Sequence, residues 1–450
     1  MTEDMIPTSN VPIEKQLHMP SNVKNALFWI MAGAIVISAI FGLPRNAYAL
    51  CPKDGATPLN IGPVNPVNGF PVYVQDSEGL ALELCLNGGT DCFFDPVLAG
   101  NAFSQDIGFG AEAFWWAAQN FINIPATGFD AILVQAVEAA FISEEPAIGD
   151  QFPFTRLRIR IDVPEPGVYT VTHPYGEEVY VVETVGAGQE IRETFDIVLS
   201  ADSSHQGRVG PLLRWDSTSP PPPAGFIGDA SIGHAVTGSP CGTNFFRITA
   251  IDFNDNPIDL DGQGGNVIMN DQFIVLGKLH TQIVPAPLVV ERTSYSRTSS
   301  GQINVFATSA TTASLTVNGG ATLNTGTPIS MSGNGSGIFF AHIPLADASS
   351  LPETVNVIAT NPGNDPRMIT STLVDQVTIT RAEYSENTET LIVEAVSSDQ
   401  STNQPTLTAT GIGLLVGGSI SMPGVAVAPT TVIVSSSAGG VDSEPVKLLP

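Results

Sequence analysis

The chain has 450 residues, of which 43% are hydrophobic, so it is long enough for about three domains with buried cores. Only 14% of the residues are charged, yet 44 acidic residues face 17 basic ones, which gives a net charge of -27. This balance excludes nucleic acid as an expected partner and disfavours anionic membrane surfaces, because both are bound through clustered lysines and arginines.

An apolar run at residues 26–43 follows two lysines and precedes the sequence NAYA, whose alanines fit an export cleavage site. We expect a signal peptide at 1–49 and a mature chain that begins at Leu50. The run also reaches the lower limit of a membrane span, so an uncleaved N-terminal anchor is the alternative. The protein is therefore expected to be exported to the cell surface, the medium or the periplasm, with no membrane insertion after leader cleavage.

All four cysteines follow the predicted cleavage point, and an even number in an exported chain indicates two disulfides. Residues 85–92, CLNGGTDC, close a short loop around an Asn-Gly-Gly turn, which favours a Cys85–Cys92 bond. Cys51–Cys241 then follows by elimination. Free or zinc-bound thiols are the weaker alternative, because no CxxC spacing occurs and no histidine lies near the first pair.

Residues 50–287 are predicted to form one disulfide-tied, β-rich domain that carries most of the acidic charge, with 29 acidic and 9 basic residues. Residues 155–163 alternate Leu and Ile with Arg156, Arg158 and Arg160, which predicts a half-buried strand with one cationic face. Further strands are expected within 167–185 and 246–280. Segments 111–121 and 130–142 are rich in alanine and could be helical, although the Ile, Val and Phe of the second favour a strand.

The acidic stretch 251–266, IDFNDNPIDLDGQGGN, is the strongest candidate for a metal site. Hard oxygen ligands at every second or third position, with glycines for turning, suit calcium. The segment DFNDNP resembles the calcium linker of cadherins, although Pro257 departs from it, and this resemblance implies calcium as a cofactor. A hairpin loop of turn-forming residues is the favoured interpretation, and the calcium site is the alternative. The candidate ligands are Asp252, Asn254, Asn256, Asp259 and Asp261.

No catalytic motif is present in the sequence, since both G-x-S-x-G and HExxH are missing. Ser204, His205, Asp216 and His234 supply the residue types of a serine hydrolase, but the sequence does not show whether they meet. The glutamate pairs 144–145 and 177–178 would point to opposite faces of a strand, so we expect solvated turn charges rather than a glycosidase pair.

Two tryptophans are weak candidates for ligand binding. Trp115 and Trp116 could stack on sugar rings, but packing in the core is the favoured interpretation, because large aromatic residues mostly supply buried area.

The remainder of the chain contains an internal repeat. Residues 290–310 align with 379–399 after a one-residue slip, 314–319 align with 406–411, and 354–361 align with 431–438. Both units alternate apolar residues with Ser or Thr at a period of two and contain frequent turn residues. We therefore expect two β-sandwich domains, at 288–374 and 375–450.

These two units resemble the immunoglobulin-like or fibronectin-like modules of secreted bacterial proteins of unassigned role. That resemblance implies an all-β chain with a spacer or binding role outside the cell. We expect a non-enzymatic protein of adhesion or extracellular assembly, whose partner is an extracellular protein or glycan. The alternatives are a carbohydrate-binding module or glycan-active hydrolase built on 50–287, and a subunit of a filament or surface layer.

Overall fold

The computed structural model describes residues 57, 59–87, 91–186, 188–199, 207–218, 220–298, 300–319, 327–345, 347 and 351–449. The predicted leader at 1–49 lies outside them. Within these ranges nearly all regular structure is strand, as predicted, and α2 (Ala102–Ile107) is the single α-helix. None of the described helical segments is both long and apolar enough to span a bilayer.

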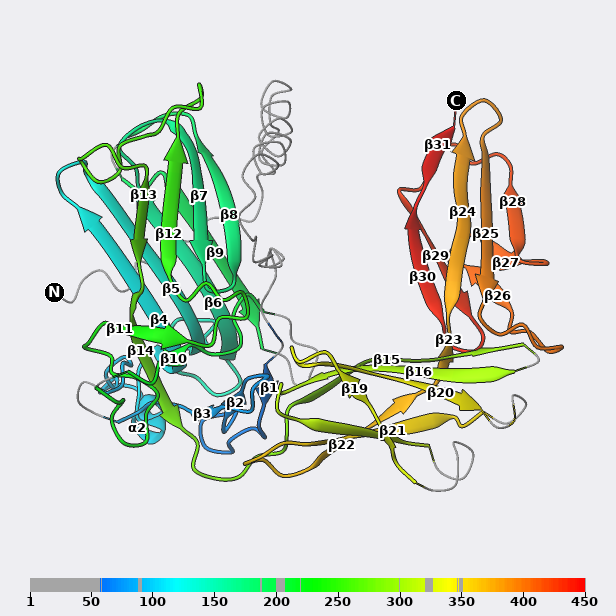
Figure 1. The fold of residues 1–450 in the computed structure, drawn as a ribbon, viewed down its shortest axis with the longest axis horizontal. Coiled ribbons are helices and arrows are strands. Elements are labelled where there is room, and N and C mark those ends of the chain that lie inside the picture. The colour runs from blue at the N-terminus through cyan, green and yellow to red at the C-terminus, as the bar shows by residue number, and fades with distance from the viewer. Residues whose placement is uncertain are drawn as a thin grey trace, which may run out of the picture. The chain divides into compact units, whose positions relative to one another are not determined.

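The first domain contains a ten-stranded antiparallel sheet in the order β1-β2-β3-β14-β4-β5-β6-β9, to which β11 and then β10 attach through β14. Its long central strands run side by side in Figure 1. The strands are β1 (Asn60–Ile61), β2 (Val74–Gln75), β3 (Ala81–Glu83), β4 (Glu112–Ile124), β5 (Phe129–Phe141), β6 (Gln151–Asp162), β9 (Ile191–Val198), β10 (Arg214–Trp215), β11 (His234–Thr237) and β14 (Gln272–Leu279).

A second, four-stranded sheet covers one face of the large sheet and completes a sandwich. Its order is β13-β12-β7-β8, from β13 (Val267–Asn270), β12 (Phe246–Ile251), β7 (Gly167–His173) and β8 (Gly176–Val182). One core joins the two layers, because Leu133 and Leu157 of the large sheet lie in the same buried cluster as Tyr169 and Ile248 of the small sheet.

The alternation predicted for 155–163 is confirmed in β6. Leu157 and Ile159 are fully buried, whereas the intervening arginines are half-buried on the other face. Both alanine-rich segments are strands, which settles the ambiguity in favour of β structure. β4 and β5 pair over their whole length, with one bulge between Phe114 and Trp116, and such pairing outweighs the small helix preference of alanine.

The short helix α2 was not predicted. Its N-cap Asn101 accepts a hydrogen bond from the Ser104 backbone N–H, and Gly108 ends it in the left-handed conformation with φ of 85°. Six residues are too few to show a helical period in the sequence.

Two immunoglobulin-like β-sandwich repeats follow, each with two sheets and its own core. In the first repeat the sheets are β19-β20-β16-β15-β23 and β18-β17-β21-β22. The strands are β15 (Leu288–Arg297), β16 (Gly301–Ser309), β17 (Ser314–Asn318), β18 (Ile329–Ser330), β19 (Ser332–Gly333), β20 (Ile338–Leu345), β21 (Thr354–Thr360), β22 (Arg367–Thr372) and β23 (Val374–Asp375).

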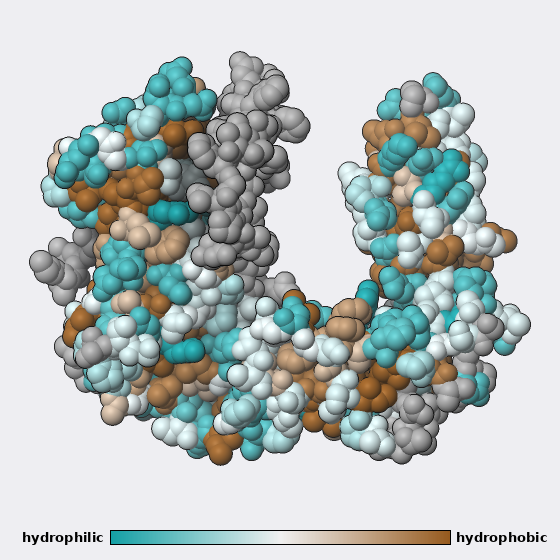
Figure 2. All heavy atoms as spheres, viewed as in Figure 1, coloured by the Kyte–Doolittle hydropathy of each residue, from teal (hydrophilic) through white to brown (hydrophobic). Residues whose placement is uncertain are grey.

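The second repeat has the sheets β28-β25-β24-β31 and β27-β26-β29-β30. Its strands are β24 (Val377–Ser385), β25 (Thr390–Ser397), β26 (Leu407–Ala409), β27 (Gly413–Leu415), β28 (Ser419–Met422), β29 (Thr431–Ser436), β30 (Val441–Pro445) and β31 (Lys447–Leu449). On the face drawn in Figure 2, hydrophobic and hydrophilic residues are interspersed over both repeats.

The backbone confirms the internal repeat. The first strand of each repeat carries a bulge at the equivalent place, between Val290 and Arg292 in β15 and between Ile379 and Arg381 in β24. Each first strand also pairs in parallel with the last strand of its repeat, β15 with β23 and β24 with β31.

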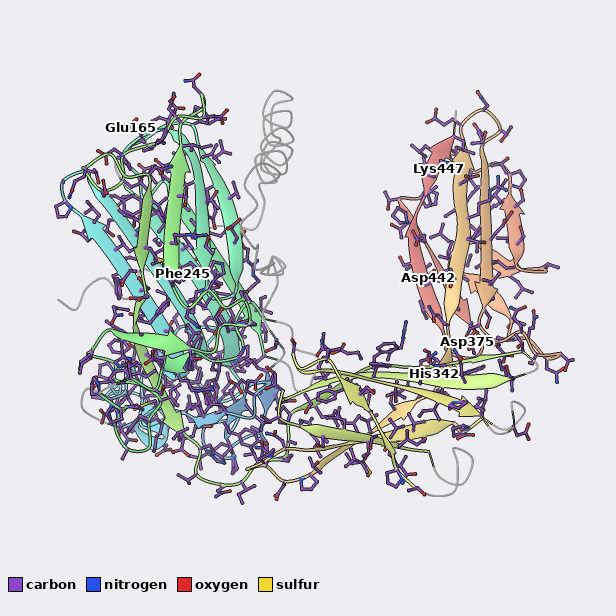
Figure 3. All side chains as sticks on the ribbon, in the orientation of Figure 1. Glu165, Phe245, His342, Asp375, Asp442 and Lys447 are labelled. Atoms are coloured by element: carbon purple, nitrogen blue, oxygen red, sulfur yellow. A yellow bond between two sulfur atoms is a disulfide. The ribbon has the colours of Figure 1, made fainter. Side chains whose placement is uncertain are left out.

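The two repeats are joined by an ion pair that is mostly buried. Arg297, at the end of β15, places Nε and Nη2 each 2.8 Å from the Asp399 carboxylate, which also accepts a hydrogen bond of 3.0 Å from the Tyr295 hydroxyl. Asp375 in β23 is buried and accepts hydrogen bonds from the Ser397 hydroxyl and the Gly440 backbone (Figure 3). The linking segment is thus held by side chains on both sides.

The predicted Cys85–Cys92 disulfide is present, with a Cα–Cα distance of 5.3 Å. It packs with Phe114, Ala117 and Leu276 in a small apolar cluster separate from the main core. Cys241 is also disulfide-bonded. Its predicted partner, Cys51, lies outside the described residues, so the Cys51–Cys241 pairing stays a prediction.

Candidate functional site

The first half of the acidic stretch is a loop organised by one carboxylate. Asp252 follows β12 and accepts hydrogen bonds from the backbone N–H groups of Asn254 and Asn256, each at 2.8 Å, and from the Asn256 side chain at 2.9 Å. These hydrogen bonds hold the pKa of Asp252 below its usual value. Asp252 thus acts as the acceptor at the centre of a turn.

The second half of the stretch repeats this arrangement. Asp259 accepts a hydrogen bond from the Gly262 N–H at 2.8 Å, and Asp261 accepts from the N–H groups of Gln263 and Gly265 at 2.7 and 2.9 Å. A Cβ on Gly265 would lie 2.3 Å from an Asp261 carboxylate oxygen, so a side chain at this position would displace that carboxylate. The backbone hydrogen bonds lower the pKa of Asp261.

The five predicted calcium ligands therefore lie in two adjacent turns, where their carboxylates already accept backbone hydrogen bonds. Across the described ranges, no group of three or more His, Cys, Asp or Glu side chains is placed to hold a metal ion. Calcium can also use amide and carbonyl oxygens. The calcium site stays a prediction, and turn formation accounts for the observed geometry.

Trp115 and Trp116, the two candidates for stacking on sugar rings, are core residues, which confirms the favoured interpretation. Trp115 and Trp116 are both 0% exposed, and the Trp116 indole N–H donates a hydrogen bond of 2.8 Å to the Leu213 carbonyl. Neither ring offers a face to a ligand. Both rings belong to the main buried cluster of the first domain, where large aromatic side chains contribute buried area.

Two of the hydrolase candidates do meet. The His234 ring stacks on Trp215 with a centroid distance of 4.3 Å, and its Nδ1 lies 3.9 Å from the Asp216 carboxylate. Nδ1 is 2.7 Å from the Ala235 carbonyl, which requires the proton on Nδ1 and leaves Nε2 as an acceptor. Thr218, which sequence reasoning missed, places its hydroxyl 3.4 Å from that Nε2.

These groups do not form a nucleophile and base pair. The Thr218 hydroxyl donates to Asp216 at 2.5 Å, and the nearby Ser231 hydroxyl donates to Asp229 at 2.6 Å. Nucleophilic activation requires the hydroxyl proton to be directed to the imidazole instead. The other candidates, Ser204 and His205, lie outside the described residues.

A buried histidine and one of the predicted glutamate pairs lie in the small sheet of the first domain. His173 ends β7 and accepts a hydrogen bond from the Tyr175 N–H, and burial together with the Arg208 charge lowers its pKa to about 3. Glu177 is exposed, whereas Glu178 is buried and paired with Arg208. The prediction that adjacent glutamates point to opposite faces is confirmed for this pair, but the expectation of a solvated turn charge is wrong for Glu178, which lies in β8 and is buried.

One hollow of about 410 Å³ lies at the edge of the first repeat, between its two sheets. Apolar, Ser, Thr and Gly residues line it. None of the described lining residues is charged. The lining residues include Leu315, Met331, Phe339, Thr316 and Ser330.

No protein-family model and no curated protein matches the chain. Among solved structures, a chimeric titin Z1Z2-Z1Z2 tandem is 15% identical, with 36% of this chain and 98% of that chain covered and a TM-score of 0.16. Tandem Ig repeats of Dlar are 11% identical, with 36% and 100% covered and a TM-score of 0.17. A bacterial ice-binding adhesin is 11% identical, with 74% and 98% covered and a TM-score of 0.16. TM-scores this low do not establish a shared fold. The repeats are immunoglobulin-like by their own strand order.

Proposed function

We propose that this is a non-enzymatic extracellular protein, in which the first domain recognises a partner and the two repeats form a spacer or assembly surface. The observation that carries the proposal is the tandem of two immunoglobulin-like sandwiches, each with its own core. Such modules bury little beyond their own cores and leave long sheet faces for contacts.

The junctions support a spacer role. Arg297 and Asp399 join the two repeats, and the first domain donates a hydrogen bond of 2.9 Å from Gln75 to the Pro285 carbonyl just before the first repeat. Arg367 of that repeat in turn donates to the Asn60 side chain at 2.9 Å. Polar contacts of this kind restrict bending between modules and would hold the first domain away from an anchoring surface.

The disulfide supports an exported protein, because disulfides persist in oxidising compartments. The proposal includes cleavage of the predicted leader and a role in adhesion or assembly at a bacterial surface. Protease accessibility tests it: externally added proteinase K should degrade the protein on intact cells, or the protein should be recovered from the medium. Protection until the cells are lysed would contradict the proposal.

The absence of catalysis is tested separately. The purified protein should not turn over generic ester, glycoside or peptide substrates above the rate of a His234→Ala variant. Turnover that this variant, or Asp216→Asn, abolished would replace the proposal with a hydrolase built on the first domain.

A further inference from the structure

The outer face of the large sheet, opposite the main core, carries a row of arginines. Arg156, Arg158 and Arg160 alternate along β6 on this face, and Arg192 on β9 lies directly opposite Arg160. We call these four residues the arginine ladder. They are four of the nine basic residues between 50 and 287, a region with 29 acidic residues. Basic charge is therefore concentrated here.

Among the described residues, only the first arginine of the ladder is in direct contact with carboxylates. Arg156 lies 3.0 Å from buried Glu138 on β5 and forms two hydrogen bonds of 2.8 Å with Asp196 on β9. The two parallel hydrogen bonds to Asp196 have the geometry that suits a guanidinium and a carboxylate.

The other three arginines lack such partners. Arg160 donates to the Ile159 and Glu193 carbonyls and to the Thr194 hydroxyl, all uncharged acceptors. The Arg158 Nε is buried with no hydrogen-bond partner. Across the described ranges, Arg158, Arg160 and Arg192 have no carboxylate within ion-pair distance. Arg158 and Arg160 are therefore partly buried without a carboxylate in direct contact, and Arg192 is exposed beside them.

This arrangement has an electrostatic cost. Burial and the neighbouring arginines lower the pKa of Arg160 to about 10, and burial and Arg156 lower the pKa of Arg158. Like charges on neighbouring strand positions destabilise a sheet. An anion bound along β6 would remove that repulsion and supply the missing hydrogen-bond acceptors.

An apolar shelf lies beside the ladder. Val134 of β5 pairs with Arg158, Ile132 pairs with Arg160, and Phe121 of β4 pairs with Ile132 on the same face. The Phe121 side chain is 45% exposed. A ligand on this face would meet charged donors along one side and apolar surface along the other.

The spacing of the charges selects among polyanions. Alternate residues of a strand are separated by about 6.8 Å. The ladder therefore presents one guanidinium group every ~6.8 Å along β6. A nucleic-acid strand carries one charge per about 3.4 Å, which is twice as dense as the charges of the ladder. A polysaccharide with one acidic group on every sugar or every second sugar matches the ladder better, and its ring faces can pack on the shelf.

We propose that the arginine ladder binds an acidic polysaccharide, carboxylated or sulfated, laid along β6. This inference rests on the proposed function, because it names the class of partner that the first domain recognises.

Affinity electrophoresis or biolayer interferometry of the full chain tests the inference, with polygalacturonate, dextran sulfate and neutral dextran as probes. Binding to either polyanion, weakening steeply with salt, is expected, and neutral dextran should not bind. The double variant Arg158→Gln, Arg160→Gln should weaken binding by about tenfold or more. The double variant Arg158→Lys, Arg160→Lys, which keeps both positive charges, should lose less affinity for the polyanion.

A control variant removes the same charge elsewhere. Arg247, whose guanidinium lies over the Phe245 ring labelled in Figure 3, and Arg292, over Phe306, are outside the ladder. Arg247→Gln, Arg292→Gln should bind within about twofold of the native chain.

Several outcomes would overturn the inference. They are failure of both polyanions to bind, equal binding of neutral dextran, or equal losses in the ladder and control variants when all proteins show native unfolding midpoints. Binding of only the carboxylated or only the sulfated polymer would support it and identify the anionic group. If the protein binds neither polyanion, the expected protease accessibility on intact cells is unchanged. The polysaccharide proposal can therefore fail without the proposed function failing.

Discussion

At the scale of single residues, the most unusual group is Glu138. It is 1% exposed and lies beside Arg156, yet burial outweighs that attraction and raises its pKa to about 8. Its usual value is 4.5. Sequence reasoning could not find this cluster, because Glu138, Arg156 and Asp196 come from three different strands.

The raised pKa predicts a pH dependence of stability. A carboxyl group with a raised folded-state pKa contributes stability that is fully present below about pH 4.5 and is lost as the pH rises through about 8. The free energy of unfolding should therefore fall between pH 5 and 8, by at most about 1.4 kcal/mol per pH unit from this residue. Glu138→Gln should flatten that slope in urea unfolding, and exposed Glu177→Gln should not. Identical slopes in all three proteins would show that Glu138 is ionised throughout.

A second residue-scale prediction separates turn formation from calcium binding at Asp252. Its carboxylate accepts three hydrogen bonds within its own loop. Asp252→Ala should therefore lower the first domain's unfolding midpoint by about 2–4 °C in EDTA as well as in calcium. Asp255→Asn, which removes a charge from the same loop and suits the left-handed backbone at that position (φ of 64°), is the control. A loss seen only in calcium, together with a calcium-dependent rise of the native midpoint, would establish the predicted ion site.

At the scale of elements, the strands were the most predictable feature. The alternation in β6 and the repeat behind β15 and β24 were readable because burial of one sheet face imposes a period of two on the sequence. β4 and β5 were ambiguous, since alanine favours helix locally and only pairing with neighbouring strands decides the outcome. The acidic loop was equally ambiguous, because turns and calcium sites use the same Asp, Asn and Gly residues.

The junction between the repeats gives an element-scale prediction. Burial would raise the pKa of Asp399, but hydrogen bonds from Arg297, Ser401 and Tyr295 lower it to about 2. The stability it contributes is present above about pH 3.8 and is lost as the pH falls through about 2. A double-mutant cycle with Arg297→Gln and Asp399→Asn should give a coupling energy of about 1–2 kcal/mol at pH 7.

The second repeat supplies the matched control for this cycle. Arg381 and Glu383 form a pair at 2.7 Å that is solvent-exposed. Surface pairs contribute little, so the same cycle there should show no measurable coupling. Equal coupling in both pairs, or none at the junction, would argue against Arg297–Asp399 as the contact that fixes the two repeats.

At the scale of the whole molecule, three separate cores predict stepwise unfolding. Calorimetry should resolve more than one transition, because each core can be lost without the others. All four cysteines precede residue 288. Reductant should therefore lower only the first domain's transition, with about 2–3 kcal/mol lost for the Cys85–Cys92 loop alone. One cooperative transition that shifts as a whole would contradict the predicted division into 50–287, 288–374 and 375–450.

The parallel pairing of first and last strands also decides how each repeat responds to tension. Because β15 and β23 run in the same direction, the chain enters the first repeat at one end of this pair and leaves it at the other. The same holds for β24 and β31. A pull along the chain would shear the hydrogen bonds between the two strands together rather than open them one after another. Each repeat should therefore resist mechanical extension more strongly than its thermal stability alone would indicate.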